Sequence, residues 1–370
     1  MKLSKFDTEI WMTVHEGDCL YNLADTCVKP MTIKDLEELI HKDLSEDIRQ
    51  ILFDYGPITG SDALKDEILK MYKKGTRDHI TITNGAVAAN HHVMMTLLEP
   101  GDHIVALTPG YQQFYSYPAS IGCTYDLIEL KEENNWQPTI EDFKAVMNEK
   151  TKMLCLNSPN NPTGTVLKKA FLEELVELAR QYDCYILIDE IYRGLSQNPE
   201  PAISDIYEKG ISTNSLAKLY SFAGLRLGWI KGPQDVIEAI NYRRDYTMIS
   251  TGAFSDYMTR VILENKEAVL NKNRKIVEKN KMILQEWLKK EKRITCVIPD
   301  DGTVCFLHYH LDYPSNKLCI ELQEKYGVFF VPGSCFNMEY HLRFGFTSSP
   351  EKVEKGLTLF SQYLDQIAAE

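Results

Sequence analysis

Short apolar runs alternate with amphipathic stretches between about residues 78 and 231. Four runs, at residues 104–107, 153–156, 185–188 and 211–213, have the length and apolar character of buried strands. Between the second and third, residues 171–180 place their apolar side chains three and four positions apart, so this stretch is predicted to be an amphipathic helix. The pattern therefore predicts strands alternating with helices.

This alternation predicts an α/β fold. Strands that are apolar throughout belong to mostly parallel sheets covered on both faces, and such sheets bind ligands at the carboxyl ends of their strands. From about residue 266, long charged helical stretches precede shorter strand signals such as 304–309, which indicates a second, smaller α+β unit. We expect an N-terminal segment (1–48) that packs with this small domain, a large domain (49–265) and a C-terminal small domain (266–370).

Composition narrows the functional classes. The net charge of −12 argues against a nucleic-acid partner, because binding a phosphate backbone requires a basic surface. No apolar run is long enough for a secretory signal or a membrane span, so we expect no membrane partner. Nine scattered cysteines without a Cys-x-x-Cys pair suggest reduced thiols and a cytoplasmic location. The adjacent pair His91 and His92 does not predict a metal site, because neighbouring helical residues face different directions.

Lys218 lies in a mostly apolar run, residues 215–229. An unpaired ammonium is costly there, and one role that removes the charge is a covalent imine with an aldehyde. Asp189 follows the strand at 185–188, where a buried carboxylate needs a cation or a strong donor. A helix cap or a core salt bridge is the alternative reading of Asp189.

Three other polar segments follow predicted strands. The turn at 157–164 fixes an amide side chain at a strand end, although turn formers alone explain it. The segment 84–90 opens a helix with a glycine, which suits phosphate binding, although many helices begin in this way. Tyr111, after Pro109 and Gly110, suits stacking on a flat ring or is an ordinary loop aromatic.

Taken in order, these segments resemble one family. Asn-Gly-Ala, Pro-Gly-Tyr, Asn-Asn-Pro-Thr-Gly, Asp-Glu-x-Tyr-Arg and Ser-x-x-Lys with an arginine eight residues on are similar to the fold-type I pyridoxal-phosphate (PLP) enzymes, aminotransferase class I/II. The resemblance spans roughly residues 55–343. It implies a large domain with a mostly parallel seven-stranded sheet between helices, plus a smaller α+β domain.

The resemblance also implies how the chain holds pyridoxal 5′-phosphate. Lys218 would form the Schiff base and carry a proton during the reaction, and Asp189 would pair with the pyridine nitrogen. Tyr192 and Asn161 would bind the phenolic oxygen of the ring, and Tyr111 would stack on its face. The residues expected around the phosphate are Gly85, Ala86, Val87, Ser215 and Arg226.

Two further residues acquire roles from this likeness. Tyr55 resembles a tyrosine that reaches the phosphate of the neighbouring subunit, which implies a homodimer with composite active sites. Arg343 occupies the position of an arginine that binds the substrate α-carboxylate, and a surface strand arginine is its alternative reading.

The sequence departs from the family pattern in two places. Residues 23–30 contain no glycine where one usually contacts the substrate carboxylate, so we expect Asp25 or Thr26 to contact the substrate. Ala217 replaces the hydroxyl residue that often precedes the lysine, and Tyr220 or Ser221 would have to compensate.

The function expected from this likeness is an aminotransferase that moves an amino group between an amino acid and a 2-oxo acid. A lyase, such as a carbon–sulfur β-lyase, a decarboxylase or a cyclase would use the same residues. A PLP-sensing regulatory protein is disfavoured, because the segment before Tyr55 leaves no room for a DNA-binding module. No second arginine suggests a dicarboxylate, whereas Glu16 and Asp25 leave a cationic substrate open.

Overall fold

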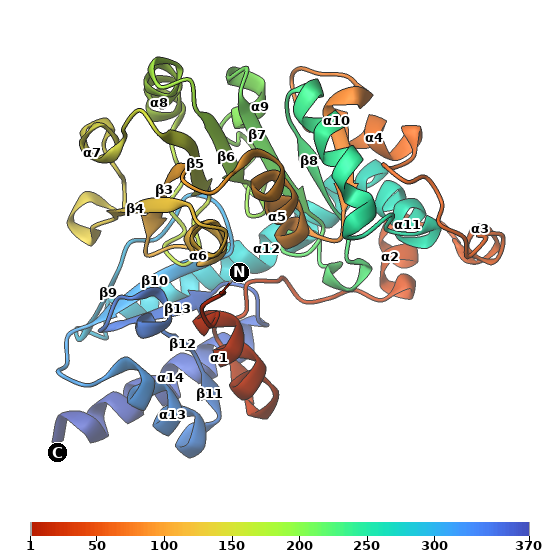
Figure 1. Ribbon diagram of the computed structural model, residues 1–370. Helices are drawn as coiled ribbons and strands as arrows, with labels where there is room; N and C mark the ends of the chain where they lie inside the picture. Colours follow the sequence, from red (N-terminus) through yellow and green to blue (C-terminus); the bar gives the residue numbers. More distant parts are fainter. Residues whose placement is uncertain (1, 370) are drawn as a thin grey trace.

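A seven-stranded sheet forms the centre of the larger part of the molecule (Figure 1). The computed structural model describes residues 2–369. The strands of this sheet are β2 (Ile80–Thr83), β3 (His103–Thr108), β4 (Thr124–Glu129), β5 (Thr151–Asn157), β6 (Tyr185–Asp189), β7 (Gly210–Ser215) and β8 (Gly228–Lys231). Their order is β2-β8-β7-β6-β5-β3-β4. Strand β8 is antiparallel to both neighbours and the other pairings are parallel, so the mostly parallel sheet is confirmed.

Helices cover both faces of this sheet. One face carries α5 (Ala86–Leu97), α6 (Gln113–Ser120) and α10 (Gln234–Arg243), and the other carries α7 (Ile140–Val146), α8 (Lys169–Gln181) and α9 (Ile203–Ile206). Helix α8 contains the predicted helical stretch 171–180. Its buried residues Leu172, Leu175 and Val176 pack in one apolar cluster, as their spacing requires.

The four predicted strands are confirmed as parts of β3, β5, β6 and β7. Successive side chains of a strand point to opposite faces, and here both faces are buried. In β3, Ile104 packs with the cluster that contains α5, whereas Val105 packs with the cluster that contains α8. Burial on both faces explains why these strands lack the polar alternation of half-exposed strands.

A second sheet belongs to the C-terminal part of the chain. Its strands are β9 (Ile294–Cys296), β10 (Val304–Tyr309), β12 (Val331–Pro332) and β13 (His341–Gly345), in the antiparallel order β12-β13-β10-β9. The long helix α12 (Lys266–Leu288), α13 (Ser315–Tyr326) and α14 (Pro350–Ala369) contribute apolar side chains to the core beside it. The fold is thus an α/β unit with a smaller α+β unit, as expected.

The N-terminal segment lies against this C-terminal part. Strand β1 (Tyr21–Asn22) pairs in parallel with β11 (Val328–Phe329), and Trp11 Nε1 donates a hydrogen bond to the Phe330 carbonyl at 3.0 Å. The remaining helices are α1 (Asp7–His15), α2 (Ile33–Ile40), α3 (Ser45–Arg49), α4 (Asp62–Leu69) and α11 (Ala253–Glu264). The domain limits at residues 48 and 265 stay a prediction.

None of the helices in residues 2–369 combines the length and apolar character needed to cross a membrane.

A buried ion pair joins β8 to α9 at the edge of the large sheet. Lys231 Nζ lies 3.1 Å from Asp205 Oδ1, and both side chains are 3% exposed. Asp205 also accepts hydrogen bonds from the backbone amides of Lys73 and Lys74. This carboxylate therefore neutralises a buried cation and fixes a loop.

We predict that Asp205→Ala lowers the free energy of unfolding by about 3–5 kcal/mol, because it leaves the Lys231 ammonium buried without its ion-pair partner. Urea unfolding followed by circular dichroism measures this loss. The matched control is Glu141→Ala, which removes an exposed partner of Lys144 and should change stability little. Equal effects of the two substitutions would contradict the prediction.

Candidate active site

Polar side chains gather at the carboxyl ends of the large-sheet strands, around a cavity of about 500 Å³. Asn157, Asp189 and Ser215 are the last residues of β5, β6 and β7. The start of α5 and the loop after β3 add further side chains. The predicted residues that line this cavity are Asp25, Ala86, Val87, Tyr111, Asn161, Asp189, Tyr192, Ser215, Lys218, Arg226 and Arg343.

Lys218 reaches this cavity from the turn that follows β7. Its Nζ donates hydrogen bonds to Thr26 Oγ1 at 2.7 Å and to Cys27 Sγ at 3.5 Å, and its carbonyl accepts one from Val28 N. Burial opposes the charge of the ammonium, but Cys27 and Tyr192 beside it prevail and raise the pKa of Lys218 above its ordinary value. A covalent bond to an aldehyde would remove this buried charge.

Asp189 is a buried carboxylate, only 5% exposed, without an ion-pair partner in the described chain. Its Oδ2 accepts a hydrogen bond from Asn90 Nδ2 at 2.8 Å and its Oδ1 accepts one from Ile191 N at 3.0 Å. Burial raises the pKa of Asp189 to about 6, although these hydrogen bonds and nearby Lys218 oppose the rise. A protonated ring nitrogen would supply the missing cation.

Three predicted ring contacts lie around the same space. Tyr192 is buried, and burial raises the pKa of its phenol. Asn161 Oδ1 accepts a hydrogen bond from Arg343 Nη1 at 3.3 Å. The backbone amide of Asn161 donates a hydrogen bond to Asn157 Oδ1 at 2.8 Å. Tyr111 donates its hydroxyl to Glu9 Oε1 at 3.2 Å.

The start of α5 forms a cradle with Arg226. Gly85 caps this helix with φ +84°, and a Cβ at this position would lie 2.8 Å from Arg226 Nη2. At Gly228, a Cβ would lie 2.6 Å from the Gly85 carbonyl carbon. The two glycines thus let a guanidinium and a helix N-terminus approach one another closely, an arrangement suited to phosphate. Gly85 stands behind the cavity wall formed by the next two residues.

Arg343, on β13, is 3% exposed and faces the same cavity. Its Nη2 contacts Met12 Sδ at 3.4 Å, and its Nε is buried without a hydrogen-bond partner. A buried guanidinium with an unused donor is suited to a carboxylate ligand. The alternative reading of Arg343 as a surface strand residue is wrong.

Three tyrosine and serine residues that the sequence associated with the site do not line the cavity. Tyr55 is 66% exposed and does not line the cavity of its own chain. Tyr220 and Ser221 also lie outside it: the Tyr220 hydroxyl faces Met71 Sδ, and Ser221 Oγ accepts a hydrogen bond from Asn273. Neither can replace the hydroxyl missing at Ala217.

The sequence reasoning missed several site residues. Asn90 donates a hydrogen bond to Asp189. It lies in the segment 84–90, but no sequence motif marks it as a site residue. Cys27 and Met12 were missed too. The signal for Cys27 was the departure from the family pattern in residues 23–30, whereas nothing local indicated that α1 would cover the cavity.

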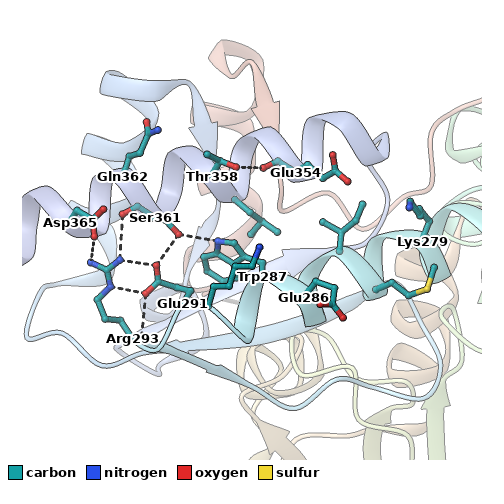
Figure 2. Close-up of a pocket in the computed structure, with 14 residues that line it drawn as sticks. Lys279, Glu286, Trp287, Glu291, Arg293, Glu354, Thr358, Ser361, Gln362 and Asp365 are labelled. Carbon is teal, nitrogen blue, oxygen red and sulfur yellow. Dashed lines mark hydrogen bonds and ion pairs between the residues drawn. The ribbon is translucent and has the colours of Figure 1, made fainter.

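A larger cavity of about 640 Å³ lies between α12 and α14 (Figure 2). Several of its polar groups bind one another: Arg293 pairs with Glu291 and Asp365, and Trp287 Nε1 donates to Ser361 Oγ. Among the described residues that line it, none has a buried polar atom without a hydrogen-bond partner, whereas Arg343 has one. The strand-end cavity is therefore the candidate active site.

Comparisons with known proteins show which family and which solved structures the chain resembles. Residues 16–360 match the family described as aminotransferase class I and II. The solved structure of a PLP-dependent aminotransferase from Streptococcus suis 89-1591 is 37% identical, with a TM-score of 0.96 and 99% of each chain covered. Capreomycidine synthase from Streptomyces vinaceus is 26% identical over 86% of this chain and 83% of its own. Aspartate aminotransferase from Thermotoga maritima is 29% identical over 82% of this chain and 80% of its own.

We predict that Asp189 destabilises the cofactor-free protein at neutral pH. Its pKa rises from 3.8 to about 6 on folding, so the folded protein binds this proton more tightly than the unfolded chain does. Stability is therefore lost as the pH rises from about 4 through 6, by about 2–3 kcal/mol. Asp189→Asn should restore that amount at pH 7 and nothing at pH 4.

The measurement is urea unfolding of the cofactor-free protein at both pH values. Asp18→Asn, at an exposed position outside the cavity, is the control and should give the same small difference at both. A pH-independent effect of Asp189→Asn would sink the prediction.

Proposed function

The chain belongs to the aminotransferase class I and II family, and on this premise we propose that it transfers an amino group between an amino acid and a 2-oxo acid through a covalent bond of Lys218 to its cofactor. It is a PLP-dependent enzyme of fold type I, and its cofactor is pyridoxal 5′-phosphate. The family resemblance found in the sequence is confirmed.

The observation that carries the proposal is the arrangement of charges around one cavity. A lysine amine, a carboxylate lacking a cation and a buried arginine with an unused donor all face it: Lys218, Asp189 and Arg343. This set matches what an amino-acid substrate and a cationic ring require. These three side chains support the proposal more strongly than the size of the cavity or family membership would alone, because one fold can serve several reactions.

When bound, pyridoxal 5′-phosphate supplies an aldehyde that condenses with amines and a ring that accepts electrons. We assign to Asp189 the role of keeping the ring nitrogen protonated, since burial raises its pKa and no described cation forms an ion pair with it. Tyr192 and Asn161 would bind the phenolic oxygen, and Tyr111 would cover the ring face. The phosphate would be held by the Gly85, Ala86 and Val87 amides, Ser215 and Arg226.

The remaining roles concern the substrate. Arg343 would hold the α-carboxylate, because its buried guanidinium lines the cavity without an ion pair to any described residue, and Nη1 donates a hydrogen bond to Asn161. With that end fixed, the Cα–H bond faces a defined direction. Lys218, once free as an amine, would take the proton from Cα and return it later. Thr26 Oγ1, 2.7 Å from Nζ, would keep the amine directed into the cavity.

A second candidate reaction is a lyase, decarboxylase or cyclase reaction at the same Cα. The observation favouring it is the relative named capreomycidine synthase, together with the altered segment 23–30. The residues assigned above serve both readings, so products must separate them. A cytoplasmic location stays a prediction from the sequence.

We predict that the purified holoenzyme converts an accepted amino acid to one equivalent of 2-oxo acid per site and then stops. Adding a 2-oxo acid should restart the reaction, because the amino group leaves only by transfer. Product analysis by mass spectrometry measures this stoichiometry. Release of ammonia or carbon dioxide without an acceptor would contradict transamination.

The control for this experiment is Lys218→Ala. Borohydride reduction of wild-type holoenzyme should leave the cofactor on the peptide that contains Lys218, and the variant should carry none. If the variant still retained covalent cofactor and turned over, the assignment of Lys218 would be wrong.

We further propose a homodimer in which Tyr55 completes the phosphate site of the partner. Leu52, Phe53 and Tyr55 are 74%, 93% and 66% exposed, which is unusual for neighbouring apolar side chains and suits an interface. Tyr55→Phe should weaken cofactor binding about 10-fold through loss of one charged hydrogen bond.

Mixing Tyr55→Phe with Lys218→Ala protein tests whether the sites are shared. A mixed dimer would have one site with both changes and one with neither, so tight cofactor binding and turnover should reappear. If mixing restored nothing, or the protein sedimented as a monomer, composite sites would be excluded.

A further inference from the structure

Four carboxylates line the active-site cavity. The proposed function assigns Asp189 to the cofactor, and Glu9 accepts the Tyr111 hydroxyl, which leaves Glu16 and Asp25. Glu16 Oε1 accepts a hydrogen bond from Asn22 Nδ2 at 3.1 Å, and Asp25 Oδ1 accepts one from Cys27 N at 2.9 Å. Neither has an ion-pair partner within residues 2–369. Both carboxylates therefore lie beside the place where a substrate would lie, without a direct ion pair.

Asn22 holds these two residues together. While its Nδ2 donates to Glu16, its Oδ1 accepts the backbone amide of Asp25 at 2.9 Å. The Asp25 carbonyl is fixed as well, because it accepts the Thr347 hydroxyl at 2.8 Å. Such bonding makes the pair a fixed feature of the cavity and not a pair of mobile surface side chains.

The negative charges of Glu16 and Asp25 repel one another. Burial raises the pKa of Glu16, and Asp25 raises it further, while Asn22, Arg343 and Lys218 oppose the rise. A ligand cation between the two carboxylates would relieve both the repulsion and the desolvation.

The cations already in the cavity have other roles. Lys218, Arg226 and Arg343 are the basic residues that line it, and the proposed function assigns them to the cofactor aldehyde, its phosphate and the substrate carboxylate. Among residues 2–369, no other basic side chain lines the cavity to bind a second carboxylate of a substrate. The unassigned charge in the cavity is negative.

Arg343 is an independent indication of the ligand. It lines the cavity, is 3% exposed, and has a buried Nε without a hydrogen-bond partner. Its Nη2 touches Met12 Sδ, and Glu16 follows Met12 by four residues, which is about 6 Å along a helix axis. A substrate held by its carboxylate at Arg343 would therefore bring a group several bonds beyond Cα to Glu16.

We propose that the substrate of this enzyme is an amino acid whose side chain ends in a positively charged group, which Glu16 and Asp25 bind. This inference rests on the proposed function, since it needs the α-carboxylate at Arg343 and the amine at Lys218. The chemistry fits an ammonium or a guanidinium on a chain of three or four carbons.

The test is titration of the holoenzyme with amino acids, followed by the absorbance of the bound cofactor. Arginine and citrulline have nearly the same shape but differ in charge. Lysine and norleucine form a second such pair, in which a methyl group replaces the charged end of the side chain. Arginine or lysine should bind at least about 10-fold more tightly than its neutral counterpart, the effect of one charge-assisted hydrogen bond. Glutamate should be the poorest ligand.

Variants locate the source of the preference. Glu16→Gln and Asp25→Asn should each reduce the cationic-to-neutral affinity ratio about 10-fold, with citrulline and norleucine binding unchanged. Asp18→Asn changes the net charge equally from an exposed position beyond the cavity and should leave the ratio unaltered. Circular dichroism and the melting temperature verify that each variant is folded.

The outcomes separate this inference from the proposed function. If the wild type bound neutral or acidic amino acids as tightly as arginine and lysine, or more tightly, the proposed cationic substrate would be wrong. The proposed aminotransferase function would still stand. A cationic preference that survives both substitutions would overturn the assignment to Glu16 and Asp25. If no amino acid changed the absorbance, the proposed function itself would fail.

Discussion

Burial of the large sheet on both faces is the constraint on which the rest of the structure depends. Because Ile104 and Val105 enter opposite apolar clusters, and their counterparts in β5 and β6 do likewise, an unpaired charge would be costly in the middle of these strands. The polar side chains of the candidate site accordingly lie at the strand ends. Asn157, Asp189 and Ser215 occupy the last positions of three adjacent strands for this reason.

Asp189 shows how the fold keeps a costly group in place. Asn90, on α5, donates to the Asp189 carboxylate and accepts the hydroxyl of Thr213 on β7. One buried amide thus fixes the register between α5 and two strands. Since Gly85 caps the same helix, the bond from Asn90 also sets the distance between Asp189 and the cradle formed with Arg226. The cofactor geometry that we propose would therefore follow from helix–sheet packing.

The sequence alone predicted those features whose signal lies in a short stretch of the chain. Apolar runs located β3, β5, β6 and β7, and motifs directly after them located Asp189, Asn161 and Lys218, because a strand end is a position along the chain. Asn90 and Met12 could not be found in this way. Their roles depend on which helix lies over which strand, and neither an asparagine inside a helix nor a methionine on an apolar face has a local signature. Tyr55 differs again, since no arrangement within one chain brings it to the cavity.

Residues 22–28 separate cofactor chemistry from substrate choice. Val28 N and Thr26 Oγ1 bind the backbone and side chain of Lys218, whereas Asp25, one residue earlier, faces the substrate space beside Glu16. A change at Asp25 would alter the charge presented to a substrate and leave the strand-end residues untouched. The residues proposed to hold the cofactor follow the strands of the large sheet, whereas the proposed contact of Asp25 with the substrate comes from a segment outside that sheet. Family membership therefore identifies the cofactor far more firmly than the substrate.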